Sequence, residues 1–367
     1  MSLLAGRSNT ATNKRYSRFN ICHCFVLLGL SGLASGASAQ DARLVSYEEL
    51  LDRVAALEED MATPSVPDAP PIDTNTDDGG FYASWEHVFV TPYFGQNTAA
   101  VIVGPGSASR VQEFDWDIEY SPRFEIGNVD ACDGTGWRAR YWHFEHSNSA
   151  SFGVPAGVSV TIAPGAFDSG IIGFAGDTVT AVHSLRMSVL DLEWLKRDIT
   201  EDGGFTASAG VRYVRMDQHL RGRRVLAGVQ VENLSQHHDF EGIGPTIAAE
   251  YLTRFDCSYW GAFINGRGAL LYGESNVRGD RRVGGVIMNN TSDSNDQDLM
   301  SVVELQIGLD YRRPSGCHEM FLRVALEAQY WANAGSASAG QAPVGDANAQ
   351  DTDLGFLGVT IATGLDW

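Results

Sequence analysis

The residues best suited to acid–base chemistry are three neighbours in the second half of the chain, His237-His238-Asp239. A histidine beside a carboxylate can activate water for hydrolysis, provided that a further acid such as Asp217 or Asp280 reaches it. No sequence motif of a hydrolase or of a phosphate-binding loop accompanies them. We therefore interpret the cluster as the solvated rim of a loop, and we predict that the protein is not an enzyme.

The cysteines form the second chemical candidate. Cys22 and Cys24 lie in a segment that we expect to be removed, whereas Cys132, Cys257 and Cys317 each fall in a short turn between extended segments. In an oxidising compartment Cys257 and Cys317 are candidates for a disulfide, with free thiols as the alternative. Cysteines this isolated, without neighbouring histidines, do not make a metal site, and we predict neither a metal nor a cofactor.

The third candidate is a set of charges that alternate with apolar residues. In the segment VELQIGLDYR, residues 303–312, every second position from Val303 is apolar or aromatic, and the positions between include Glu304 and Asp310. Because an arginine that faces lipid at the bilayer midplane costs about 2–4 kcal/mol, such charges must share an interior. They would either line a pore or plug a narrow barrel with ion pairs. The predicted interior set is Arg138, Arg140, Asp191, Glu193, Arg212, Glu250, Arg267, Glu304, Asp310, Arg323 and Glu327, with Asp115 and Glu119 on the same face.

The elements that position these charges are long strands. A period of two runs through segments of 11–15 residues, about twice the usual strand length, and tilted strands of that length can cross a bilayer. Their apolar faces often end in tyrosine, tryptophan or phenylalanine, which is typical of the aromatic girdles of outer-membrane barrels. The predicted strands are 81–93, 112–127, 136–147, 182–196, 204–216, 239–253, 259–273, 300–312, 319–332 and 355–367.

The connections between the strands alternate in length. The long ones are predicted near 95–111, 148–180, 217–238, 274–298 and 333–353, and the short ones near 128–135, 197–203, 254–258 and 312–318. Short turns at one end and long loops at the other are typical of a membrane barrel. A sheet in hydrocarbon must also close on itself to pair its backbone groups. We predict an all-β fold, an antiparallel transmembrane β-barrel of about ten strands at 81–367.

The last segment, FLGVTIATGLDW, explains why the chain stops on a tryptophan. Val359, Ile361, Leu365 and Trp367 share one face, and glycines and polar residues share the other. We interpret this as the closing strand of the barrel, with Trp367 at the membrane interface. A terminal strand that ends on an aromatic residue resembles the signal that is read by the bacterial barrel-assembly machinery, which we predict as a partner.

The N-terminal region has three predicted parts. Residues 1–39 combine bases, a short apolar run and an Ala-Ser-Ala site, as in a signal peptide. Residues 40–61 form a short periplasmic helix with coiled-coil-like spacing over 44–61, which would either join copies into a homo-oligomer or lie on the main domain. Residues 62–80 are a Pro- and Asp-rich linker.

The charge of the chain excludes one class of partner. The formal net charge is -20, and removing residues 1–39 takes away four bases and no acids, which leaves 22 bases against 46 acids and a net charge of -24. So acidic a protein does not bind nucleic acid or bare anionic lipid.

Several stretches resemble a known family. GWRARYWHF (136–144), LDLE (190–193), AGVRY (209–213), FEGIGPT (240–246), NGRGALLYG (265–273) and LEAQYW (326–331) occur in an order similar to that in pore-forming proteins related to the Legionella major outer membrane protein. The resemblance covers roughly residues 81–367. It implies an outer-membrane barrel that forms a pore, and no catalytic residues.

We therefore expect a bacterial outer-membrane β-barrel through which small solutes or ions pass passively along a narrow, charged lumen. Its partners would be outer-membrane lipid and lipopolysaccharide. The alternative is a structural or adhesive barrel whose extracellular loops bind ligands, and a protease acting at the rim is the weakest reading.

Overall fold

The computed structural model describes residues 80–107, 109–162, 164, 170–200, 203–256, 258–315, 318–338 and 352–367. The predicted signal peptide, the helix at 40–61, the linker up to residue 79, and both Cys257 and Cys317 lie outside these residues. Among the residues described, no helix is long and apolar enough to cross a membrane.

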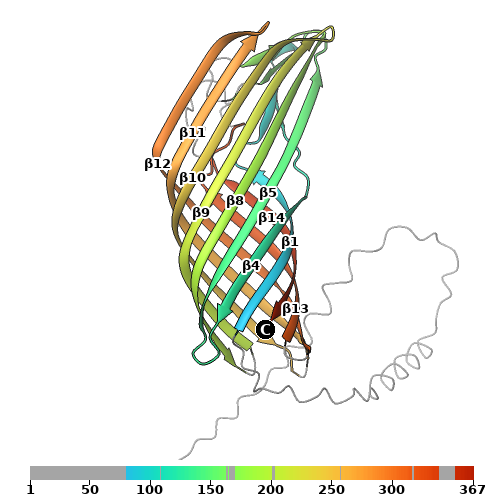
Figure 1. The fold of residues 1–367 in the computed structure, drawn as a ribbon. Helices are drawn as coiled ribbons and strands as arrows, with labels where there is room; N and C mark the ends of the chain where they lie inside the picture. The colour runs from blue at the N-terminus through green and yellow to red at the C-terminus, as the bar shows by residue number, and fades with distance from the viewer. Residues whose placement is uncertain are drawn as a thin grey trace, which may run out of the picture. The chain divides into compact units, whose positions relative to one another are not determined.

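Ten antiparallel strands close into a barrel, as predicted (Figure 1). Each strand pairs with its neighbour in the chain, and the last pairs with the first. The strands are β1 (Gly80–Phe94), β4 (Glu119–Val129), β5 (Thr135–Gly153), β8 (Asp177–Thr200), β9 (Gly203–Leu226), β10 (Val229–Arg254), β11 (Trp260–Val283), β12 (Val286–Ser315), β13 (His318–Ala332) and β14 (Leu354–Asp366).

Strand β14 closes the barrel. It pairs with β13 on one side and with β1 on the other, where Val359 lies opposite Phe89. The Trp367 amide donates to the carbonyl oxygen of Phe81 at 2.9 Å, so hydrogen bonding continues to the last residue. Val359, Ile361, Leu365 and Trp367 all have exposed side chains, as expected for an outward apolar face.

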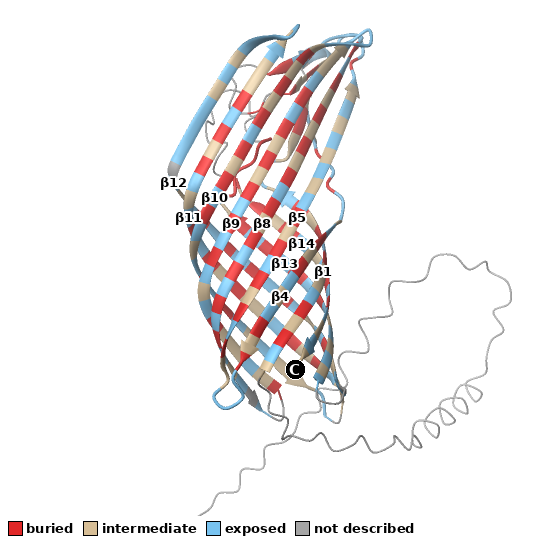
Figure 2. Ribbon diagram, in the orientation of Figure 1, coloured by how far each residue is buried: buried red, intermediate tan, exposed pale blue. Residues whose placement is uncertain are grey.

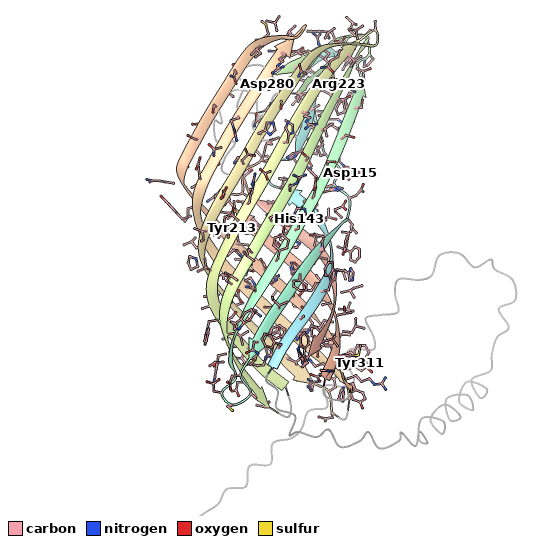
Figure 3. The ribbon with its side chains drawn as sticks, viewed as in Figure 1. Asp115, His143, Tyr213, Arg223, Asp280 and Tyr311 are labelled. Atoms are coloured by element: carbon pink, nitrogen blue, oxygen red, sulfur yellow. The ribbon has the colours of Figure 1, made fainter. Side chains whose placement is uncertain are left out.

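The outer surface carries two aromatic bands. Between them, buried and exposed residues alternate along the strands (Figure 2). Tyr213 belongs to one band and Tyr311 to the other (Figure 3). The outward residues between the bands are mostly aliphatic, with Trp85, Phe89 and Phe124 added on β1 and β4, so this zone matches the apolar belt of a membrane barrel. The first band includes Tyr93, Tyr120, Tyr141, Tyr213, Tyr272 and Tyr330; the second includes Trp137, Trp194, Phe205, Tyr251, Trp260 and Tyr311.

Two of the predicted long loops are wrong. Residues 217–238 and 274–298 continue the strands and reverse in two-residue turns at Ala227-Gly228 and Gly284-Gly285. All four turn residues have positive φ, between 50° and 83°, which is the conformation of the tight turns that match the twist of a hairpin. Six strands, β5 and β8 to β12, therefore extend beyond the Tyr213 band and form a tall wall (Figure 1). We call the end of the barrel that carries this wall the outer end.

A second, four-stranded sheet packs against this wall. It consists of β2 (Thr98–Val103), β3 (Ser109–Glu113), β6 (Ser159–Ile162) and β7 (Ile171–Gly173), with a 3₁₀ turn at Pro105–Ser107. Its buried Val160, Ile162 and Ile171 join the same hydrophobic cluster as Val179 and Leu220 of the wall. The predicted loops at 95–111 and 148–180 thus contain an ordered layer.

The strand predicted at 112–127 begins late. Residues 114–118 are not strand, and β4 starts at Glu119. Phe114 and Trp116, expected on the lipid face, are instead buried at 3% and 7% exposure. They pack in the mouth of the barrel because the wall continues above the membrane band there and offers an apolar inner surface.

Candidate functional site: the lumen of the barrel

The centre of the lumen is occupied by paired charges. Arg212 of β9 donates from Nε and Nη2 to the two carboxylate oxygens of Asp191 on β8, at 2.6 and 2.9 Å. Its third nitrogen, Nη1, lies 2.6 Å from Glu304 on β12. Arg212 and Asp191 are each 1% exposed. A charge buried this deeply is tolerable only because it is paired and hydrogen-bonded.

The carboxylates are shared among several arginines. Glu304 accepts a hydrogen bond from Arg140 at 3.2 Å and forms an ion pair with Arg212 at 2.6 Å, and Arg267 lies 3.8 Å away. Asp191 is likewise within 4.0 Å of all three arginines. Each of these two acids therefore has alternative partners at hand, so one pair can break without leaving a bare charge.

Two further groups extend this network. Arg123 of β4 connects to β13, with Nη2 at 2.5 Å from Glu327, and to the adjacent β1, with Nη1 at 2.8 Å from Glu86. Arg138 lies 2.5 Å from Glu193, which also contacts Arg267.

The opposite end of the barrel, which we call the inner end, carries the β4–β5 and β8–β9 turns. Nearer this end, Arg323 bridges Glu250 at 3.0 Å and Asp310 at 2.6 Å. The eleven residues of the predicted interior set, without Asp115 and Glu119, thus lie in the lumen. That they line a conducting pore stays a prediction.

Little room remains between these charges. A cavity of about 60 Å³ opens toward the inner end, lined by residues that include Glu125, Arg138, Glu250 and Arg323. It has room for about two water molecules, since a water occupies about 30 Å³ of liquid. The lumen is therefore nearly filled at this level.

An apolar layer lies next to the charges on the outer side. Trp142 and Phe356 meet edge to face, with ring centroids 5.5 Å apart, and Trp331 lies 6.3 Å from Trp142. The guanidinium of Arg123 lies over Trp142, and that of Arg212 lies over Trp331. The rest of the layer is Phe144, Val189, Val214, Met216, Leu271, Met300 and Val302, all at most 3% exposed. Such a layer excludes water and ions.

A loop segment fills the mouth above the apolar layer. The side-chain amide of Gln218, on β9, donates to the carbonyl oxygens of Ala334 and Gly335 and accepts from the amide of Ala337. Gln218 and Ala337 are both fully buried. The segment 334–338, all of it buried, therefore lies inside the barrel rather than over it.

Two histidines are buried in the same mouth. His183 is fully buried among the rings of Phe94, Phe114 and Trp116, with centroids 5.0–5.5 Å away. Burial lowers the pKa of His183 to about 3 and that of His238 to about 4. Both imidazoles are therefore neutral near pH 7.

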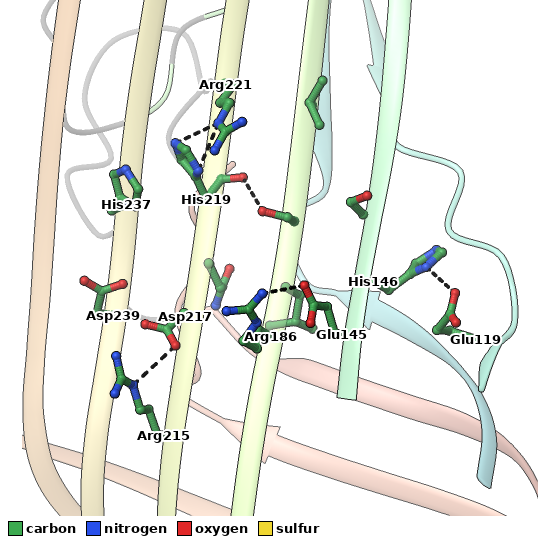
Figure 4. Close-up of a pocket in the computed structure, with 15 residues that line it drawn as sticks. Glu119, Glu145, His146, Arg186, Arg215, Asp217, His219, Arg221, His237 and Asp239 are labelled. Atoms are coloured by element: carbon green, nitrogen blue, oxygen red, sulfur yellow. Dashed lines mark hydrogen bonds and ion pairs between the residues drawn. The ribbon is translucent and has the colours of Figure 1, made fainter. Parts of the chain in front are cut away.

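The cluster at 237–239 does not form a loop rim. It lies on β10, where His238 points inward and bonds to Ser275 at 3.0 Å, while His237 and Asp239 face outward. His237 stacks on His219 at a centroid separation of 3.7 Å, and Asp239 stands opposite Asp217 (Figure 4). These residues line a groove of about 660 Å³. No hydrogen bond joins a histidine to an aspartate within this group of described side chains.

Two acids predicted on the interior face lie elsewhere. Asp115 is exposed in the segment before β4, and Glu119 pairs with His146 at 2.7 Å on the rim of the groove. Cys132 is an exposed free cysteine in the β4–β5 turn. Among the described residues no group of histidine, cysteine and acid side chains could hold a metal ion.

Sequence reasoning missed some important lumen residues. Arg123, Glu86 and Gln218 are not in the predicted interior set. The alternation in β4 and β1 carried the signal for Arg123 and Glu86. Gln218 had no such signal, because it lies in a segment predicted to be a loop.

A closed ten-stranded barrel, two aromatic bands and an aliphatic belt between them define an outer-membrane β-barrel protein. The sequence agrees: residues 89–367 match the model of the family described as Legionella pneumophila major outer membrane protein precursor. The chain belongs to this family and lies in the bacterial outer membrane. The inner end of the barrel accordingly faces the periplasm, and the outer end with its wall faces the outside of the cell.

No curated protein matches the chain in sequence. Among solved structures, the outer membrane protease OmpT of Escherichia coli is 10% identical with a TM-score of 0.43, covering 79% of this chain and 97% of its own. The Pseudomonas putida toluene transporter TodX is 9% identical with a TM-score of 0.27, covering 78% and 89%. A Pseudomonas aeruginosa FadL homologue is 5% identical with a TM-score of 0.25, covering 78% and 90%. Similarities this weak say nothing about function.

Proposed function

We propose that the protein is a gated pore that is closed at rest and admits small ions or solutes when its lumen rearranges. The observation that supports this most is the sharing of Glu304 and Asp191 among three arginines. A network with spare partners can exchange pairs at a small cost, whereas an isolated buried pair costs about 3–5 kcal/mol to break.

Opening also requires movement on the outer side of the network. The apolar layer around Trp331 and the segment 334–338 both block the route. The segment is held by three hydrogen bonds to Gln218, by the Ser336 and Ser338 hydroxyls, which donate to the Gln96 carbonyl oxygen, and by the Gly335 amide, which donates to Thr352. At about 1 kcal/mol for each bond, its release costs several kcal/mol and is therefore infrequent. A steadily open channel does not fit these contacts, and we propose brief openings instead.

Planar-bilayer recording of the Glu304→Gln variant tests the role of the network. Without the shared carboxylate, Arg140, Arg212 and Arg267 repel one another, so openings should become several-fold more frequent than in the wild type. Glu145→Gln, on the outer face, is the matched control and should leave the openings unchanged. A heat-dependent shift in gel mobility checks that each variant is folded. Identical traces for Glu304→Gln and the wild type would refute this gate.

A second candidate is a surface-binding barrel. The observation in its favour is the ordered outer half, where a four-stranded sheet and the wall share one hydrophobic cluster. A protein that stays electrically silent under every condition would favour this candidate.

The proposal includes four contacts with other molecules. Outer-membrane lipid surrounds the aliphatic belt, and lipopolysaccharide meets the polar surface just outside the Tyr213 band. The barrel-assembly machinery recognises the strand that ends at Trp367. Residues 44–61 join copies of the protein into a small oligomer.

A further inference from the structure

The outer end of the wall carries exposed apolar side chains where a soluble surface would carry polar ones. Six residues on three turns make up this set, which we call the apolar tip. Their exposed fractions lie between 47% and 64%. The residues are Phe174, Leu226, Val229, Val286, Ile287 and Met288.

The three turns lie side by side. The amide of Gly284 in the β11–β12 turn donates to the carbonyl oxygen of Val231 at 2.9 Å, which joins that turn to the start of β10. On the other side, Asp177 pairs with Leu226 in register, and its amide donates to the carbonyl oxygen of Phe174. The six side chains therefore form one patch rather than scattered exposed residues.

The backbone beneath the patch is already paired. Leu226 lies opposite Val229, and Val283 lies opposite Val286, so only two residues of each hairpin extend beyond the last pair. An unpaired peptide group in an apolar medium costs several kcal/mol. A hairpin that ends this tightly can enter such a medium with few unpaired groups.

The shape and size of the patch select the partner. A stable protein interface uses about 20–30 residues on each side, far more than the tip offers. The tip also lies at the far end of a tall wall, since 13 residues of β9 separate Leu226 from Tyr213, or about 40 Å along the strand. We propose that the apolar tip inserts into the interface of a lipid bilayer that faces the bacterial surface.

The charges beside the tip do not select an anionic lipid. Only charges within a Debye length of about 8 Å act on a bilayer at the tip, and there Asp177, Glu232 and Asp280 pair with Arg224, Arg281 and Arg282, respectively. The tip therefore binds through its apolar side chains, and zwitterionic phosphatidylcholine is the target. The affinity of one copy should be weak, comparable with the roughly 10⁴ M⁻¹ of a single acyl chain, and many copies on one cell would add to it. This inference does not depend on whether the lumen conducts.

Flotation tests the proposal directly. The full mature chain, folded in nanodiscs of bacterial phospholipid, is mixed with phosphatidylcholine vesicles and centrifuged through a density gradient. The wild type should float with the vesicles, and the Leu226→Ser/Ile287→Ser/Met288→Ser variant should bind at least tenfold more weakly. Val111→Ser is the matched control, because Val111 is 55% exposed but lies on β3 outside the tip. Its binding should equal that of the wild type.

A second measurement covers the case in which the triple variant fails to fold. Phe174→Trp places a fluorescent ring in the tip, and brominated phosphatidylcholine should quench it, whereas Val111→Trp should not respond. Absence of wild-type flotation, equal loss in the Val111→Ser control, a need for anionic lipid, or an unquenched Phe174→Trp would each overturn the proposal. Binding to a protein surface but not to vesicles would overturn it too.

Discussion

Replacing Arg212 with glutamine should destabilise the barrel strongly. The change removes two hydrogen bonds to Asp191, at 2.6 and 2.9 Å, and the contact with Glu304 at 2.6 Å. Removing one partner of a buried ion pair costs about 3–5 kcal/mol. Both acids keep contacts with Arg140 and Arg267, so we expect a loss near the lower limit, about 3 kcal/mol.

Denaturant unfolding of the detergent-folded protein measures this cost. Arg186→Gln is the control, because the Arg186–Glu145 pair is 57% and 55% exposed and should contribute less than about 1 kcal/mol. The double variant Arg212→Gln/Glu304→Gln restores charge balance and should lose less stability than the two single variants added together. A loss below about 1 kcal/mol for Arg212→Gln would show that water already screens these charges, and the closed lumen would be refuted.

Four further predictions concern other parts of the molecule. His183 and His238 must stay neutral when folded but titrate near 6.5 when unfolded, so stability is complete above pH 6.5 and falls toward pH 4. We expect a loss of about 2 kcal/mol per histidine at pH 5, visible as a lower unfolding midpoint than at pH 7.5. Gly134→Ala should reduce the yield of folded barrel, because φ at Gly134 is +65° and a Cβ would meet the Arg197 carbonyl oxygen; Gly153→Ala, with open space around it, is the control. Deleting Trp367, or inserting one residue after Gly358, should block membrane insertion, since a one-residue slip turns the apolar face of β14 inward; a normal membrane yield would contradict this. A Cys257–Cys317 disulfide would be detected as one linked peptide pair by mass spectrometry without reductant, and two free thiols would exclude it.

The strands inside the membrane belt could be read from the sequence because lipid imposes a strict period of two. Arg212 lies between Val211 and Tyr213, and only one of the two faces tolerates a charge. The same rule located the interior arginines and acids without any knowledge of their partners.

Outside the membrane belt, a period of two no longer distinguishes a strand from a loop. Residues 217–238 alternate too, but their outward positions face water and carry charges, so the segment resembles a loop. The turn Ala227-Gly228 lacks the usual Asn-Gly signal of a hairpin. Contacts across the lumen could not be predicted from the sequence either. Arg123 and Glu327 are 204 residues apart, and their contact depends on how the strands tilt as the barrel closes.

The most direct test of the closed, gated lumen is a planar-bilayer recording of the wild-type protein in a salt gradient. A nearly filled lumen with exchangeable ion pairs should give a silent baseline with brief, discrete openings. A steady current that begins at insertion and scales with salt concentration would contradict it.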